Sequence, residues 1–205
     1  MKKLFIALLA TLSISLCNAQ DMQMKGVMSL EFGSTREQVK QTLLAKQPSA
    51  KIYSSTERSI SFQDVTWGAY KTFLFMCQFS DDDRLHSVLI FVEPEHCSKI
   101  FTLYDEITKI INERYYITTK SLESYSYPYE RKDKYRYTET MVKNGKVTMQ
   151  SLWTFDSRNT PSNTEDDNCI KTDVADDCLV IITYQDGLII DEVVAKQKAK
   201  QSKDY

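Results

Sequence analysis

Histidines and clustered carboxylates are the side chains of this chain whose types could do acid-base or metal chemistry. The two histidines, His86 and His96, have the side chain whose ordinary pKa lies nearest neutral pH. Neither stands near a serine or cysteine at a spacing typical of a catalytic pair, and the sequence has no GxSxG elbow, HExxH helix or glycine-rich phosphate loop. The pattern favours a strand position for His86 and a helix-entry position for His96 over catalysis.

Two groups of carboxylates are candidates for calcium, which takes about 6 to 8 oxygen ligands. One group is Asp81 to Asp83, and the other runs from Glu165 to Asp177. Neither has the alternating ligand positions and central glycine of a recognised calcium loop. Solvated turns are therefore the favoured interpretation, and we predict no metal and no cofactor.

Four cysteines lie beyond residue 19: Cys77, Cys97, Cys169 and Cys178. They allow three disulfide connectivities. Cys169 and Cys178 flank one polar loop, and a bond between them would close about ten residues and contribute roughly 2.5 to 3 kcal/mol. Cys77 is expected in a strand and Cys97 at the next helix start, farther apart than the Cα distance of about 4 to 7 Å that a disulfide needs. We predict a Cys169–Cys178 disulfide, with Cys77 and Cys97 reduced and buried.

Tyrosines recur at alternate positions between Ser121 and Tyr137. The spacing predicts that the first three share one face of an extended segment that Pro128 keeps at a sheet edge. In the strand expected next, Arg136 falls opposite Trp153, where a cation–π contact can form. Such an aromatic band can stack on a sugar or receive a peptide strand, and packing into the core is the alternative. The predicted binding residues are Tyr125, Tyr127, Tyr129, Tyr135, Tyr137, Arg136 and Trp153.

The central element that must position these groups is a hairpin followed by a long helix. Tyr70–Phe79 and Leu85–Val92 are β-branched or aromatic runs around the turn Asp81 to Asp83. Both faces of this hairpin are apolar, so it should lie inside the sheet. From Ser98 the apolar period becomes helical, and the predicted buried stripe contains Ile100, Leu103, Tyr104, Ile107, Ile110, Ile111 and Arg114.

Local motifs predict the other elements. Ser34 and Glu37 have the spacing of a capping box that starts a helix ended by Pro48. Asn144-Gly145 predicts a two-residue hairpin turn between strands 135–143 and 146–155. Asp186-Gly187 predicts a second one, between strands 179–184 and 188–190, and a helix is expected over 191–201.

Residues 1–19 have the three parts of a secretory signal peptide: basic Lys2 and Lys3, an apolar run, and small residues ahead of Gln20. We expect cleavage after Ala19 and a periplasmic or secreted chain; lipid attachment at Cys17 is the less favoured alternative. No segment reaches the roughly 20 apolar residues of a transmembrane helix. Beyond residue 19 the chain has 24 basic and 28 acidic residues, a balance that disfavours nucleic acid as a partner.

These elements predict an α+β fold with an antiparallel sheet of about seven or eight strands and the helices mainly on one face, because tight turns cannot join parallel neighbours. We expect residues 20–205 to form a single exported domain, with two pseudo-repeated halves of about 27–117 and 118–205 as the alternative division. The segment Leu30–Lys40 resembles the start of exported modules of the small-protein-A/outer-membrane-lipoprotein-A family and of β-lactamase-inhibitor-protein-like folds, in which a glycine and a capped helix precede antiparallel strands. That resemblance implies a non-catalytic protein of the cell envelope.

Three classes of function follow from these observations. The leading hypothesis is an exported, non-catalytic binding or envelope-assembly module whose partner is an unknown protein or glycan of the cell envelope. The alternative is a hydrolase-type enzyme, which requires a histidine within about 3 Å of a serine, cysteine or carboxylate inside a cleft. A third class, an envelope structural protein, predicts a broad apolar patch in place of a pocket.

Overall fold

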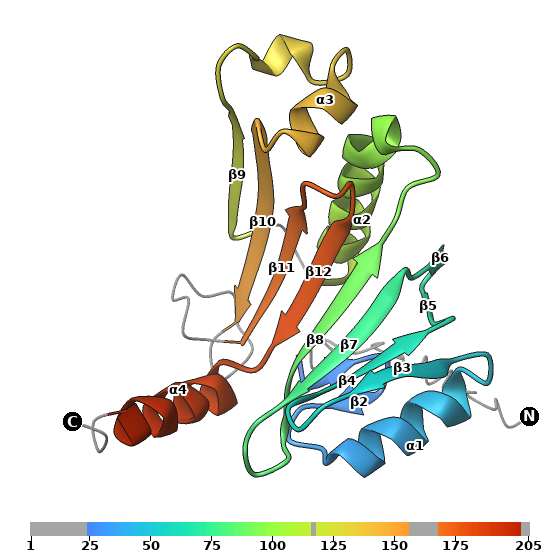
Figure 1. Cartoon of the computed structure of the whole chain (residues 1–205), viewed down its shortest axis with the longest axis vertical. Helices are drawn as coiled ribbons and strands as arrows, with labels where there is room; N and C mark the ends of the chain where they lie inside the picture. The colour runs from blue at the N-terminus through green and yellow to red at the C-terminus, as the bar shows by residue number, and fades with distance from the viewer. Residues whose placement is uncertain (1–23, 116–117, 156–167, 202–205) are drawn as a thin grey trace, which may run out of the picture.

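The computed structural model describes residues 24–115, 118–155 and 168–201. Within these residues the main feature is one continuous eight-stranded antiparallel sheet with the strand order β3-β4-β7-β8-β12-β11-β10-β9 (Figure 1). The strand direction turns steadily across it, from β9 to β3, which is the normal twist of a large sheet (Figure 1). This architecture confirms the α+β class and the antiparallel sheet predicted from the sequence.

The sheet is built from two meanders of four strands. The first contains β3 (Lys51–Ser55), β4 (Ser59–Gln63), β7 (Leu74–Phe79) and β8 (Leu85–Val92). The second contains β9 (Lys120–Tyr125), β10 (Val147–Phe155), β11 (Asn168–Val174) and β12 (Val180–Gln185). Antiparallel pairing of β8 with β12 joins the two meanders at the centre of the sheet.

Two short hairpins stand beside the main sheet. One pairs β1 (Gly26–Val27) with β2 (Leu30–Glu31), and the other pairs β5 (Thr66–Trp67) with β6 (Tyr70–Lys71). At Gly26 a Cβ atom would lie 1.7 Å from the Leu30 carbonyl oxygen, so only glycine allows this close approach.

The central hairpin lies inside the sheet as predicted, but its first strand begins at Leu74, because Tyr70 and Lys71 belong to β6 and pair with β5. β7 and β8 pair over almost their whole length, and both are flanked by other strands of the main sheet. Burial alternates along β7: Phe75, Cys77 and Phe79 are buried, whereas the residues between them are half-buried. One face of the hairpin therefore enters the core, and the other is only partly covered.

Helix α1 (Arg36–Lys46) precedes the first meander. Its capping box uses Thr35 and Gln38, one residue later than the predicted pair Ser34 and Glu37. The backbone of Ser34 is occupied, because its carbonyl oxygen accepts a hydrogen bond of 2.8 Å from the amide of Leu85. Ser34 is therefore held in extended pairing with β8, and the helix begins after it.

Helix α2 (Ile100–Tyr115) follows a 3-10 turn, η1 (Cys97–Lys99), and packs on β11 and β12. Ile110 and Arg114, predicted in its buried stripe, are exposed instead. Asn112 fastens the helix to the sheet, because its side-chain oxygen accepts hydrogen bonds of 2.9 Å from the Trp153 indole and from the Thr118 amide. The buried residues of the stripe are Ile100, Leu103, Tyr104, Ile107 and Ile111.

The hairpin predicted at Asn144-Gly145 is wrong. Residues 138–143 form a short helix, α3 (Thr138–Lys143). A primed hairpin turn needs positive φ at both central residues, but Asn144 has φ −100° and only Gly145, at +59°, is left-handed. The amide of Gly145 bonds the Val142 carbonyl and that of Lys146 bonds the Met141 carbonyl, which is the glycine-terminated end of a helix.

The second predicted primed turn, at Asp186-Gly187, is also a helix boundary. The segment from Gly187 forms α4 (Gly187–Gln201), so the strand predicted over 188–190 is helical. The Asp186 carboxylate caps this helix by accepting a 3.0 Å hydrogen bond from the Ile189 amide. Arg84 and Lys196 then link the helix to the β7–β8 turn through ion pairs with Glu192 and Asp82.

The predicted Cys169–Cys178 disulfide is wrong, because Cys178 pairs with Cys97 at a Cα–Cα distance of 5.4 Å. Residues 168–174, read from the sequence as loop, form β11, which starts beside Cys169 and ends before the turn that carries Cys178. At about 3.3 Å per residue the two cysteines lie near opposite ends of a hairpin, beyond disulfide reach. Cys77 is a buried thiol, as predicted, whereas Cys97 is not reduced.

The order helix, then four-stranded meander, occurs twice along the chain. α1 precedes β3, β4, β7 and β8; α2 precedes β9 to β12. The alternative division proposed near residue 117 would leave α2 in the first half, whereas its contacts with β11 and β12 place it in the second. Pairing of β8 with β12 keeps both units in one sheet.

Candidate binding surfaces

The described helices α1 and α2 leave the opposite face of the sheet partly uncovered. The core cluster contains buried residues of α1 and α2 together with alternate residues of the central strands. Along β7 and β12 the intervening residues are half-buried. We call this surface the open face; two rows of directly paired residues define its middle: Met76, Leu89, Thr183, Lys171 and Leu152, then Leu74, Phe91, Ile181, Asp173, Gln150 and Leu122.

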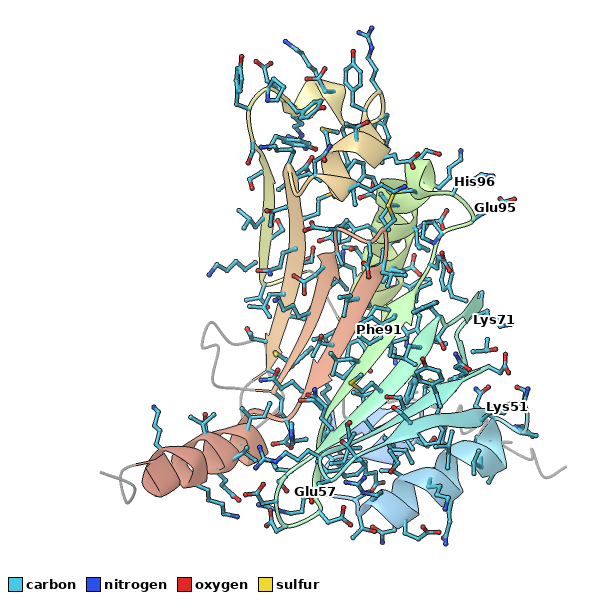
Figure 2. All side chains as sticks on the ribbon, in the orientation of Figure 1. Lys51, Glu57, Lys71, Phe91, Glu95 and His96 are labelled. Carbon is cyan, nitrogen blue, oxygen red and sulfur yellow. A yellow bond between two sulfur atoms is a disulfide. The ribbon has the colours of Figure 1, made fainter. Side chains whose placement is uncertain are left out.

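The open face is apolar in its middle. A sheet with one face in water normally carries polar side chains on that face, but seven of the eleven residues in the two rows are leucine, isoleucine, methionine or phenylalanine. Phe91 stands near the centre (Figure 2). The charged pair on this face, Lys171 and Asp173, is internally compensated at 3.2 Å, and Gln150 donates to Asp173 at 2.7 Å. The surface therefore has few unpaired charges.

The dimensions of the open face suit a macromolecular partner. Six strands at about 4.8 Å spacing make a platform about 25 Å wide, and strands of six to nine residues make it about 20 Å long. A standard protein interface buries about 800 Å² on each partner, which is of the same order.

The predicted tyrosine band does not lie on two extended strands. Tyr125 ends β9, and the rest of the band belongs to the connection that carries η2 (Arg131–Asp133) and α3 at one end of the sheet (Figure 1). Tyr127 is 90% exposed and Tyr135 68% exposed. Tyr129 and Tyr137 have ring centroids 5.8 Å apart. The segment thus brings Tyr129 and Tyr137 into contact without the predicted strand register.

Two members of the predicted band are separated from each other by the structure. Trp153 is 1% exposed, pairs with Ile170 of β11 and belongs to the core, so it is not a binding residue. Arg136 lies over the Tyr137 ring at 5.1 Å instead of opposite Trp153. The cause is α3, which replaces the strand that the register required.

Two adjoining depressions of about 480 and 470 Å³ lie beside the β5–β6 hairpin and share Asp64 and Lys71. The Asp64 carboxylate lies 3.1 Å from the Lys51 ammonium and 3.4 Å from that of Lys71, and these two lysines, Lys51 first, lower its pKa. One carboxylate is therefore shared by two ammonium groups. A third depression, of about 470 Å³, lies nearby beside Leu43 and Gly68.

The histidines meet only part of the condition for an enzyme. His86 Nδ1 lies 2.9 Å from Ser87 Oγ, within hydrogen-bond range. Ser87 is, however, 3% exposed, and neither residue lines any of the three depressions. His96 is exposed at the entry to η1, as predicted, and points outward at the edge of the molecule (Figure 2). Neither histidine thus lines one of the three depressions described above.

Burial of His86 makes the stability of the fold pH-dependent. Burial lowers the pKa of His86 below 6.5, against the opposite effects of the Phe79 backbone and the Asp186 carboxylate. The unfolded chain binds this proton near pH 6.5, whereas the folded chain binds it only at lower pH. The contribution of neutral His86 to the free energy of unfolding should therefore be complete above pH 6.5. It should decrease as the pH drops towards the folded pKa, by at most about 1.4 kcal/mol per pH unit.

Urea unfolding between pH 5 and 8 tests this effect, with His86→Gln as the matched variant. The parent curve should have the steeper slope just below pH 6.5. Equal slopes in the two proteins would exclude His86 as the cause.

The carboxylates of the β7–β8 turn are ion-paired. Asp81 contacts Arg58 at 2.8 Å, and Asp83 contacts Arg36 at 3.5 Å. Asp82 contacts Arg84 at 2.9 Å. Within the described residues no cluster of three or more histidine, cysteine, aspartate or glutamate side chains could hold a metal ion; Glu165 to Asp167 lie outside that part of the chain.

Neither family models, nor curated proteins, nor solved structures match this chain. In the part of the chain that the structure describes, no helix is long and apolar enough to cross a membrane. The predicted signal peptide, residues 1–19, lies outside the described residues.

Sequence reasoning did not identify the open face as a site. The apolar residues on both sides of β7 and β8 predict only that the hairpin lies inside the sheet. The number of helices is the signal that could have shown that one face of the sheet is uncovered. α1 and α2 can cover one face of eight strands, which leaves the second face partly in water.

Proposed function

We propose that this chain is an exported, non-catalytic binding or envelope-assembly protein whose open face docks a folded partner protein. The observation that carries the proposal is the apolar middle of that face in two central strands, β8 and β12, where a solvated sheet face is ordinarily polar. Large exposed apolar patches on soluble proteins mark interaction sites. The breadth of the face and the compensated Lys171–Asp173 pair favour a protein over a small ligand.

Export is supported by two features. Residues 1–19 have the pattern of a signal peptide, and the Cys97–Cys178 disulfide fits the oxidising compartments in which such bonds persist. The helix-then-strands order of residues 36–92 also agrees with the order found in the envelope modules that Leu30–Lys40 resembles. We expect the chain in the periplasm or outside the cell.

The test compares capture of proteins from envelope extract by the parent chain and by Leu89→Glu, Ile181→Glu. Both substitutions place a charge on the open face, where it stays in contact with water in the free protein but would be buried without a counter-ion in a complex. We expect a partner that the parent retains and the double variant loses, with affinity for the purified partner reduced at least 100-fold.

Ile110→Glu is the matched control, because Ile110 is an exposed apolar residue of α2, away from the open face. It should bind like the parent. The proposal would be contradicted if the open-face variant retained the same proteins as the parent. It would also be contradicted if the substitutions abolished only self-association of the chain.

A further inference from the structure

The segment 126–146 differs in charge from the rest of the molecule. It contains six basic and three acidic residues, so it carries three net positive charges, whereas the whole chain has a formal net charge of −2. The segment projects beyond the ends of β9 and β10 (Figure 1). We call residues 126–146 the tip.

Several cations of the tip are already paired and cannot be counted as free. Lys134, with a side chain only 12% exposed, lies near Glu123 and Asp105, and Lys132 contacts Glu130 at 2.8 Å. Arg136 is exposed and forms no ion pair with any described residue. Arg131 contacts Glu123 at 3.5 Å, but its side chain is 83% exposed. These two guanidinium groups are therefore the exposed arginine charges of the tip.

The tip also presents aromatic side chains to water. Tyr127 and Tyr135 are 90% and 68% exposed, and Tyr137, 39% exposed, lies under the Arg136 guanidinium. None of the three depressions described above lies at the tip, which projects from the end of the sheet (Figure 1). Projecting tyrosines interspersed with arginines are suited to the headgroup region of a bilayer, where the ring takes the apolar side and the cation meets phosphate.

We propose that the tip attaches the protein peripherally to a membrane surface that contains anionic phospholipid. The positive tip on a chain of net negative charge supplies the charge complementarity and favours the orientation in which the tip faces the membrane. The proposal is independent of the partner-binding open face, which lies on the sheet and does not include the tip.

The experiment is co-sedimentation of the full chain with vesicles of 30% phosphatidylglycerol and 70% phosphatidylcholine, beside vesicles of phosphatidylcholine alone. The parent should bind the anionic vesicles at least tenfold more strongly, and the difference should shrink in high salt. Because each arginine near such a surface changes binding about fivefold, Arg131→Gln, Arg136→Gln should weaken it roughly 30-fold. Tyr127→Ala, Tyr135→Ala should weaken binding to both kinds of vesicle.

Two control variants change the same charge and the same ring elsewhere: Lys51→Gln, Lys71→Gln and Tyr53→Ala. Lys51 and Lys71 lie well away from the tip (Figure 2) and have side chains 76% exposed, and Tyr53 is 63% exposed. They should bind vesicles like the parent, and any contribution of residues 1–19 is common to all variants. Equal binding by the tip variants and the parent would overturn the proposal, as would binding to a soluble acidic polysaccharide with none to vesicles.

Discussion

Loss of the Cys97–Cys178 disulfide should destabilise the protein by roughly 4.5 kcal/mol, because the bond closes a loop with a sequence separation of 81 residues and loop-closure entropy grows with loop length. The bond ties the entry of α2 to the turn between β11 and β12. For a chain of this size the loss corresponds to a decrease in Tm of about 10 to 15 °C.

Thermal unfolding of Cys97→Ser, Cys178→Ser with and without reductant measures the effect. Reductant should lower the Tm of the parent to that of the double variant and leave the variant unchanged. A peptide map of the unreduced parent should contain a 97–178 crosslink; a 169–178 crosslink would show that β11 does not end where the structure places it.

Trp153→Ala should lower the free energy of unfolding by about 3 to 5 kcal/mol, the usual loss when a buried tryptophan side chain is removed. The indole is 1% exposed and donates a 2.9 Å hydrogen bond to Asn112, so the substitution removes both core volume and a link between β10 and α2. Tyr127→Ala is the informative companion, because the sequence grouped the two residues on one binding surface. At 90% exposure Tyr127 should change the free energy of unfolding by less than about 0.5 kcal/mol.

Urea unfolding with unchanged m-values in all three proteins would make the comparison valid. Similar destabilisation by the two substitutions would contradict the burial of Trp153 in the core and the exposure of Tyr127.

Elements with a long, regular period were predictable from the sequence. The hairpin of β7 and β8 is marked by two β-branched or aromatic runs around an acidic turn, and the helix over residues 100–115 has an apolar period of 3.6. The structure at short glycine motifs was not predictable from the sequence, because Asn144-Gly145 suits both a hairpin turn and a helix end. Here Met141 and Val142 are both buried, which favours the helix.

The predicted contact of Arg136 with Trp153 is wrong for the same reason, because it requires a strand where the chain forms α3. The error at β11 has a different cause: its polar residues favour a loop, and pairing with β10 and β12 makes it a strand. The disulfide and the open face depend on which strands become neighbours across the two meanders, and that choice is set by long-range pairing of β8 with β12.

Site-specific photocrosslinking in the cells that produce this chain tests the proposed binding face most directly. A photoreactive residue at Thr183, in the middle of the open face, is compared with one at Lys109, whose side chain is 77% exposed on α2. We predict a discrete adduct with a different protein from position 183 and none from position 109. An adduct from position 109 alone, or no adduct other than a dimer of the chain at position 183, would contradict a partner-binding role for the open face.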